Sequence, residues 1–244
     1  MGTVLVTGGS RGIGRAIVEA LVAEPSAVDR RVAFTWRVSE AASREVERAA
    51  RGRARAFHLD LRDHGRPDAL VGEIEEDLGP IEGLVNNAAL RRESLLAMMT
   101  DEDWDEVLDS NLGGLFRCCR AVLRGMMVRR RGAIVNIGSL SAFRGVAGET
   151  AYAAAKAGIL GLTRALAREV GRRRVRVNAV VPGFVATEMT SGLPPATVDF
   201  LRAGECLPEG TSAASVADAV LFLLSDRAAA ITGQTLVVDA GTSA

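Results

Sequence analysis

The chain contains one tyrosine and one lysine, and these stand four residues apart, at Tyr152 and Lys156. The rest of its 30 lysines and arginines are arginine, whose guanidinium keeps its charge and cannot adjust its pKa as an ammonium can. On a helix, residues i and i+4 share a face, so the phenol and the ammonium would be neighbours. We expect the cation to lower the tyrosine pKa toward neutrality and make the phenol a general acid or base. Ser139, a short distance upstream, can add a hydroxyl to the same site.

A glycine motif, Gly8-x-x-x-Gly12-x-Gly14, follows a short β-branched run and precedes a helical pattern. Glycines let the backbone turn tightly and approach a pyrophosphate, and the helix N-terminus offers free N–H groups and a positive dipole end. The motif predicts a dinucleotide-binding loop at the first strand-to-helix junction, although glycines in a tight turn have a simpler explanation. The predicted cofactor contacts in this loop are Gly8, Ser10, Arg11, Gly12, Ile13 and Gly14.

The end of the second predicted strand bears on which nicotinamide cofactor is bound. An NAD site usually has Asp or Glu there, about 20 residues past the glycines, to bind the ribose diol. Trp36 and Arg37 occupy that place here, and no carboxylate follows in Val38 or Ser39. Arg37 and Arg11 could bind a 2′-phosphate instead, which favours NADPH, unless Arg37 is only one of many surface arginines.

The composition is typical of a soluble globular protein, with 244 residues of which 48% are hydrophobic and 25% charged. Acidic and basic residues balance at 30 each, so no overall field would attract nucleic acid or an anionic membrane. The three cysteines have no metal-binding or redox spacing, which predicts reduced thiols and no metal site. No apolar run reaches the roughly 18–20 residues that cross a bilayer, and the chain opens on a strand-like run rather than a signal peptide. We therefore expect a cytoplasmic protein.

Short β-branched runs alternate with helical patterns, which predicts an α/β fold with one doubly wound, parallel sheet of seven strands and helices on both faces. Because no linker or repeat divides the chain, residues 1–244 are expected to form a single Rossmann-type NAD(P)-binding domain. An irregular segment at 187–211 follows the sixth predicted strand and is the candidate substrate lid. The predicted strands are Thr3–Val6, Arg31–Trp36, Arg55–Leu59, Gly83–Asn86, Ala133–Ile137, Arg176–Val180 and Thr235–Val238. The predicted helices are Arg15–Ala23, Glu40–Arg51, Asp68–Asp77, Asp103–Arg129, Ala151–Val170 and Ala214–Leu224.

Together these motifs resemble the short-chain dehydrogenase/reductase family over nearly the whole chain. Besides the glycine motif, the matching residues are Asp60-Leu61, Asn86–Ala89, Asn111, the set of Ser139, Tyr152 and Lys156, and Pro182-Gly183. By this resemblance Tyr152 is the proton donor to a carbonyl and Ser139 steadies the developing oxyanion. Lys156 would lower the tyrosine pKa and bind the nicotinamide ribose, and Asn111 would hold a water that passes protons to Lys156.

The resemblance also implies the remaining cofactor contacts. Asp60 and Leu61 would contact the adenine, Asn86 the adenosine ribose, and Val185 and Thr187 the carboxamide. The full set beyond the glycine loop is Arg37, Asp60, Leu61, Asn86, Ala88, Tyr152, Lys156, Pro182, Gly183, Val185 and Thr187. Loop and helix capping is the structural alternative for Asn86 and Asn111.

Within the family the chain most resembles β-ketoacyl-[acyl-carrier-protein] reductases, in segments 93–111, 151–162, 177–187 and 219–233. This implies NADPH-dependent reduction of a 3-oxoacyl thioester, a homotetramer, and docking of the acidic carrier protein through Arg129 and Arg172. The arginine runs around these two residues could also be solvated surface. Reduction or oxidation of another ketone or alcohol (a polyketide intermediate, a sugar or a steroid) stays open. A non-catalytic cofactor sensor, or an epimerase or dehydratase on the same fold, is a more distant alternative.

Overall fold

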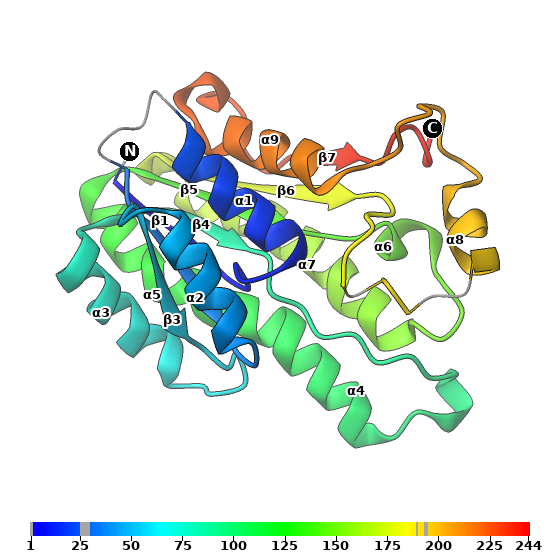
Figure 1. Cartoon of the computed structure of the whole chain (residues 1–244). Helices are drawn as coiled ribbons and strands as arrows, with labels where there is room; N and C mark the ends of the chain where they lie inside the picture. The colour runs from blue at the N-terminus through cyan, green and yellow to red at the C-terminus, as the bar shows by residue number, and fades with distance from the viewer. Residues whose placement is uncertain (1, 25–29, 189, 193–194) are drawn as a thin grey trace.

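The computed structural model describes the chain except for residues 1, 25–29, 189 and 193–194. Its strands are β1 (Thr3–Val6), β2 (Val32–Trp36), β3 (Ala54–His58), β4 (Ile81–Asn86), β5 (Gly132–Ile137), β6 (Val175–Pro182) and β7 (Thr235–Val238). They form one seven-stranded sheet in the order β3-β2-β1-β4-β5-β6-β7 (Figure 1). All neighbouring strands are parallel, so the predicted doubly wound α/β fold is confirmed.

Helices cover both faces of the sheet. The helices are α1 (Gly12–Ala23), α2 (Glu40–Ala49), α3 (Arg66–Leu78), α4 (Asp101–Leu108), α5 (Gly114–Arg129), α6 (Ser141–Arg144), α7 (Thr150–Val170), α8 (Pro195–Arg202) and α9 (Ala213–Leu224). Helices α1, α2 and α9 pack on one face, where Ile17 and Val220 join the core. Helices α3, α5 and α7 pack on the other, with Ile74 and Ile159 in a second core. The strands are apolar on both sides because each side is buried under helices.

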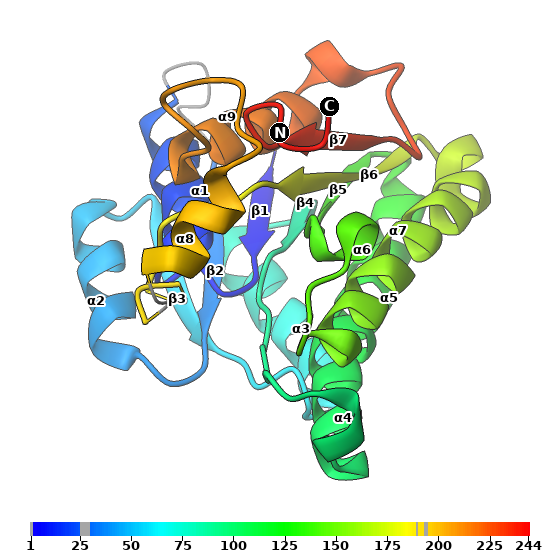
Figure 2. The same ribbon diagram turned by 90° about the vertical axis from the view of Figure 1, so that its right-hand side faces the viewer.

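The strand order reverses between β1 and β4, and this reversal determines where a ligand can bind. The chain leaves β1 toward β2 on one side, whereas β4 continues the sheet on the other. In open parallel sheets, ligands bind in the crevice outside the carboxyl ends of the strands at such a reversal. The glycine loop follows β1 and the Asn87–Ala89 segment follows β4, so both border this crevice. Figure 2 views the molecule from the side on which the carboxyl ends of the strands lie, with α6 and α8 in front.

The predicted long helix at 103–129 is two helices joined by a π-helical turn at Asp109–Gly113. The turn holds one residue more than an α-helical turn, and apolar periodicity alone does not reveal such an insertion. Asn111 lies within it, and π-helical turns are frequent at functional sites.

The predicted lid contains a helix, α8, that the sequence did not predict. Residues 189, 193 and 194 of this segment lie outside the described residues. Among the residues that the structure describes, no helix is both long and apolar enough to cross a membrane.

Candidate active site

A cavity of about 870 Å³ lies where the strands end, within the usual size range of cofactor and small-molecule sites. It joins the glycine loop to the tyrosine–lysine pair, which are far apart in the sequence. The predicted residues that line it are Gly8, Ser10, Arg11, Gly12, Ile13, Gly14, Arg37, Asp60, Leu61, Ala88, Ser139, Tyr152, Lys156, Pro182, Gly183, Val185 and Thr187. From the candidate lid, Thr197, Phe200 and Leu201 of α8 reach the same cavity.

The glycine loop has the shape that a pyrophosphate site requires. Gly8 (φ +67°) and Gly12 (φ +53°) adopt left-handed backbone angles that favour glycine. A Cβ at Gly14 would lie 2.1 Å from the Gly8 carbonyl oxygen, so the loop closes tightly on itself. Asn87 braces this arrangement, because its Nδ2 donates to the carbonyls of Thr7 at 3.0 Å and Gly8 at 3.2 Å. Helix α1 begins at Gly12, and its first N–H groups are free to bind an anion.

Tyr152 and Lys156 lie one turn apart on α7, and Ser139 follows β5. Lys156 Nζ lies 5.5 Å from the centroid of the Tyr152 ring and donates to the Ile137 carbonyl at 2.8 Å. The lysine is 2% exposed, and this burial lowers its pKa to about 8. The only lysine of the chain therefore changes its charge near neutral pH beside the only tyrosine.

The expectation that the pKa of Tyr152 is lowered toward neutrality is wrong for the protein without a bound cofactor. Burial, and after it the nearby Glu149 carboxylate, raise the pKa of Tyr152 to about 12. Arg91 and a hydrogen bond with Ser139 act in the opposite direction but are outweighed. The physical reason is desolvation, which disfavours a phenolate more than these contacts favour it. The phenol is therefore neutral, which is the form that can donate a proton.

Asn111 does not line the cavity, and its side chain is fully used by the backbone around it. Nδ2 donates to the carbonyls of Leu90 and Val107, both at 2.8 Å, and Oδ1 accepts from the Leu90 N–H at 3.0 Å. The side chain thus ties the segment after β4 to the π-helical turn, as the structural alternative expects. The water-holding role implied for Asn111 would have to come from its main chain.

Asn86 also lies outside the cavity wall, so the ribose contact implied for it is not made by its side chain. Its Nδ2 donates to Asn136 Oδ1 of β5 at 2.9 Å and to Cys119 Sγ of α5 at 3.3 Å, in the buried layer between the sheet and α5. The physical reason is alternation along the strand: Asn86 ends β4 and points into the core, whereas Asn87 points to the loop. Asn87, which belongs to the matched Asn86–Ala89 motif but was given no role of its own, lines the cavity.

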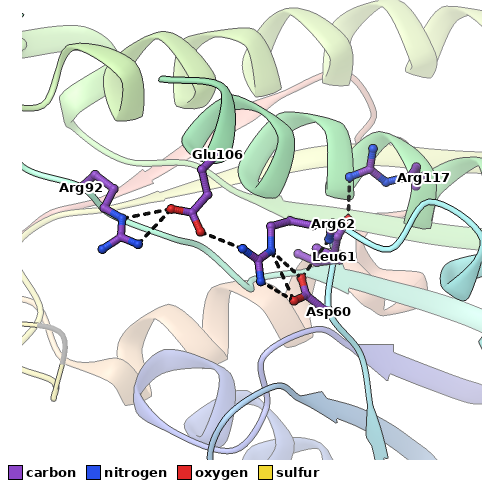
Figure 3. A network of polar contacts seen from close by, with 6 residues as sticks. All are labelled: Asp60, Leu61, Arg62, Arg92, Glu106 and Arg117. Atoms are coloured by element: carbon purple, nitrogen blue, oxygen red, sulfur yellow. Dashed lines mark hydrogen bonds and ion pairs between the residues drawn. The ribbon is translucent and has the colours of Figure 1, made fainter. Parts of the chain in front are cut away.

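Asp60 and Leu61 are fixed at the cavity rim by a network of charged groups (Figure 3). Arg62 Nη2 pairs with Asp60 at 2.7 Å and holds the pKa of that carboxyl down at about 2. Arg62 Nη1, the second terminal nitrogen of the same guanidinium, pairs with Glu106 of α4 at 2.8 Å. Arg117 of α5 donates to the Leu61 carbonyl at 2.5 Å. Two helices thus hold the segment that would contact an adenine ring.

Comparison with known proteins identifies the family. The matching family model, over residues 8–243, is described as enoyl-(acyl carrier protein) reductase and is a short-chain dehydrogenase/reductase model. The chain belongs to the short-chain dehydrogenase/reductase family. It is 41% identical over 241 residues to the 3-oxoacyl-[acyl-carrier-protein] reductase FabG of Escherichia coli K12, covering 97% of this chain and 95% of that protein. FabG of Chlamydia trachomatis is 40% identical over 240 residues, covering 98% and 96%. The predicted resemblance to the short-chain dehydrogenase/reductase family, and within it to 3-oxoacyl-[acyl-carrier-protein] reductases, is confirmed.

Three further cavity residues of this short-chain dehydrogenase/reductase escaped the sequence analysis. Arg91, Ser141 and Glu149 line the cavity beside Tyr152, and Glu149 contacts both of the others. The one available signal was an acidic residue, Glu149, three positions ahead of the tyrosine. Arg91 carried no signal, because only the fold brings the segment after β4 against the start of α7.

Proposed function

We propose that the protein is an NADPH-dependent reductase that converts a 3-oxoacyl thioester on acyl carrier protein into the 3-hydroxyacyl form. The observation that carries the proposal is one cavity holding the glycine loop together with Tyr152, Lys156 and Ser139. The full-length similarity to 3-oxoacyl-[acyl-carrier-protein] reductases supports this substrate class. Its cysteines are Cys118, Cys119 and Cys206, all free thiols, which suits the reducing cytoplasm that we propose as its location.

The reaction needs one hydride and one proton to turn the ketone into an alcohol. When bound, NADPH supplies the hydride. Tyr152, which is neutral, donates its phenolic proton to the carbonyl oxygen, and Ser139 donates a hydrogen bond to the same oxygen as charge develops there. Lys156 stabilises the phenolate that remains, and a pKa of about 8 allows it to pass a proton onward near neutral pH.

The choice of NADPH over NADH rests on the charges at the end of β2. Arg37 and Arg11 are exposed and line the cavity, and both can reach a 2′-phosphate. The strand end itself offers Trp36, whose ring packs edge-on against His58, with centroids 4.9 Å apart. An acidic residue at this place would bind the ribose diol of NAD, and the chain has none there.

The test is NADPH oxidation against a panel of 3-oxoacyl thioesters, on carrier protein and on small thiols, and of free ketones. We expect the highest kcat/KM with the carrier-bound thioester and almost no turnover by Tyr152→Phe. A higher kcat/KM for a free ketone would contradict the proposed substrate and favour another ketoreductase. No turnover with any member of the panel would favour a protein that only binds the cofactor.

Carrier docking is proposed at the basic surface formed by Arg129–Arg131 and Arg172–Arg174. The two runs lie side by side, because Arg130 Nη2 donates to the Arg172 carbonyl at 3.2 Å. Within the first run, Arg129 is partly committed to the fold through Glu75 at 3.0 Å and the Ile81 carbonyl at 2.8 Å. Charge reversal at Arg129 would therefore disturb packing as well as docking, so the exposed Arg130 and Arg172 make the cleaner test.

The docking experiment compares Arg130→Glu/Arg172→Glu with Arg31→Glu/Arg51→Glu, which reverses two exposed arginines ahead of β2 and β3 instead. The first pair should raise KM for carrier-bound substrate, more strongly at low salt, because exposed charges are screened over about 8 Å at physiological salt. KM for a small thioester should stay constant. Equal effects of both pairs, or equal effects on both substrates, would contradict docking at this surface.

A homotetramer is proposed from apolar side chains left on the surface of two elements. Leu236 and Val237 of the edge strand β7 are 38% and 37% exposed, and Phe116 and Val128 of α5 are 46% and 79% exposed. Symmetric assemblies commonly bury such patches at paired two-fold interfaces. A monomeric mass by light scattering at micromolar concentration would contradict the proposal.

A further inference from the structure

Two opposite charges lie inside the cavity, and the reaction proposed above does not use them. Glu149 immediately precedes α7, is 4% exposed, and forms an ion pair through Oε1 with Arg91. The Arg91 side chain, from the segment after β4, is 18% exposed. Removing a carboxylate from water is costly unless a charged partner and hydrogen bonds replace its hydration. The Arg91–Glu149 pair is therefore a largely buried ion pair of the cavity wall and not an exposed surface pair.

The second carboxylate oxygen of Glu149 anchors a chain of hydroxyls that ends at Ser139. Ser141 Oγ donates to Glu149 Oε2 at 2.6 Å, and Ser139 Oγ donates to Ser141 Oγ at 3.2 Å. The Ser141 N–H also donates to Ser139 Oγ, at 3.2 Å. An ionised carboxylate can only accept, so Glu149 sets the donor direction of the Ser141 hydroxyl and leaves Ser141 Oγ to accept from Ser139 when no substrate is bound. During reduction the single Ser139 O–H turns to the substrate oxygen, while the Ser141 N–H still holds Ser139 Oγ in place. Glu149 thereby holds Ser139 Oγ near Tyr152, where Ser139 is one of the groups that lower the pKa of the phenol.

Glu149 also acts on Tyr152 through its charge. The charged groups that face the phenol are Lys156 on the same helix, Glu149 at the start of that helix, and Arg91 from the segment after β4. Glu93 and Arg144 border the same cavity farther out. After burial itself, Glu149 is the strongest influence that raises the pKa of Tyr152. Removal of this one negative charge should therefore be visible at the phenol.

We propose that Glu149 is a positioning residue of this active site: it orients Ser139 through Ser141 and places a negative charge three residues ahead of Tyr152, while Arg91 keeps the carboxylate in place. The inference rests on the proposed role of Tyr152 as proton donor. It contains two parts, a charge and a hydroxyl chain, which substitution can separate.

The charge is tested by titrating Tyr152 directly, because a chain with one tyrosine gives one phenolate signal in near-ultraviolet difference absorbance. Glu149→Gln keeps the shape and removes the charge, so the phenol should ionise about one pH unit earlier than in the unchanged protein. Glu93→Gln is the matched control, because Glu93 pairs with the same arginine at 2.8 Å but is 55% exposed and does not contact Ser141. Its titration midpoint should stay in place. An unmoved midpoint in Glu149→Gln, or an equal shift in both variants, would overturn the charge part.

The hydroxyl chain is tested by Ser141→Ala, which leaves the ion pair intact. The loss of one hydrogen bond that orients Ser139 should lower kcat about three- to tenfold with KM unchanged. The phenol midpoint should stay that of the unchanged protein, since the charge is still present. Adding Ser141→Ala to Glu149→Gln should lower kcat less than the product of the two single effects, because both act on one chain. An unchanged kcat in Ser141→Ala would overturn the positioning part.

Circular dichroism recorded during the titration shows whether the protein is still folded when the phenol ionises. If Glu149→Gln does not fold, Arg91→Gln/Glu149→Gln leaves no unpaired buried charge and should show a smaller shift in the same direction. The absorbance titration needs neither substrate nor turnover. If the protein reduced none of the ketones in the panel, the proposed function would fail, while the shift at Tyr152 would still decide the charge part.

Discussion

Replacing Gly14 by alanine tests the phosphate loop where the structure leaves no room for a side chain. A Cβ at this position would lie 2.1 Å from the Gly8 carbonyl oxygen and 2.5 Å from Asn87 Nδ2. Atoms in folded proteins do not approach so closely, so either the carbonyl or the amide must move away. Either movement breaks the hydrogen bonds from Asn87 to the carbonyls of Thr7 and Gly8. It also turns the N–H groups at the start of α1 away from a pyrophosphate.

The cost follows from these contacts. Two neutral hydrogen bonds contribute about 0.5–1.5 kcal/mol each, and overpacking typically costs about 1–3 kcal/mol, so the total is roughly 2–6 kcal/mol. Part of this cost lowers the free energy of unfolding and part weakens cofactor binding. Since a factor of ten in Kd corresponds to about 1.4 kcal/mol, we expect a Kd for NADPH at least about tenfold higher. A chain of this length loses about 2–4 °C of Tm per kcal/mol, so Tm should also fall by several degrees.

The assay is NADPH fluorescence titration together with thermal unfolding, and the chain supplies a matched control. Gly72 lies in the middle of α3, and a Cβ there would meet nothing within 4 Å. Gly72→Ala should raise the free energy of unfolding by about 0.5–1 kcal/mol, because alanine loses less backbone entropy in a helix, and should leave NADPH binding unchanged. If Gly14→Ala binds NADPH within twofold of the unchanged protein and melts at the same temperature, the loop does not close tightly at Gly14 and this prediction is wrong.

Three further outcomes are expected. Tyr152→Phe should lower turnover by about 10²–10⁴-fold with the Kd for NADPH unchanged, because only the transferable proton is lost; near-normal turnover would refute the mechanism. Trp36→Asp with Arg37→Ser should shift preference toward NADH by roughly one to two decades, the worth of a charge-assisted phosphate contact of about 1.5–3 kcal/mol. A preference of the unchanged protein for NADH in kcat/KM would rule this out. The pKa of Lys156 is about 8 when folded and about 10.4 when unfolded, so in this window the unfolded chain binds more protons and the free energy of unfolding should rise with pH. Lys156→Met, measured by chemical denaturation at each pH, should lack this rise; parallel curves would contradict it.

The sheet could be predicted from the sequence because each strand is a short run of apolar, β-branched residues between polar turns. The predicted Thr3–Val6 and Thr235–Val238 coincide with β1 and β7, and the ends of the other strands differ from the prediction by at most two residues. Elements that depend on contacts from elsewhere were missed. Helix α6 has only four residues, and α8 lies in a proline-rich segment over the cavity, so neither has enough periodicity to be recognised.

The site residues could be named from their types and spacing, but their surroundings could not. Spacing places Lys156 beside Tyr152, yet it does not show that the ammonium donates to the Ile137 carbonyl or that burial dominates the tyrosine pKa. Asn86 and Asn87 are adjacent and identical in type, and only the direction of β4 decides that Asn87 braces the glycine loop. The Arg91–Glu149 pair joins segments that only the folded chain brings together.

The retention of a single lysine follows from what this cavity demands. Lys156 is buried with a backbone carbonyl as its partner, and such burial lowers its pKa and costs stability at neutral pH. A fold selected for stability alone would place an apolar side chain there. An arginine would be worse for the chemistry, because a guanidinium in the same place would remain charged and could not pass a proton. Every other lysine-or-arginine position of the chain is an arginine. The one lysine stands where a cation must both stabilise a phenolate and titrate near neutral pH.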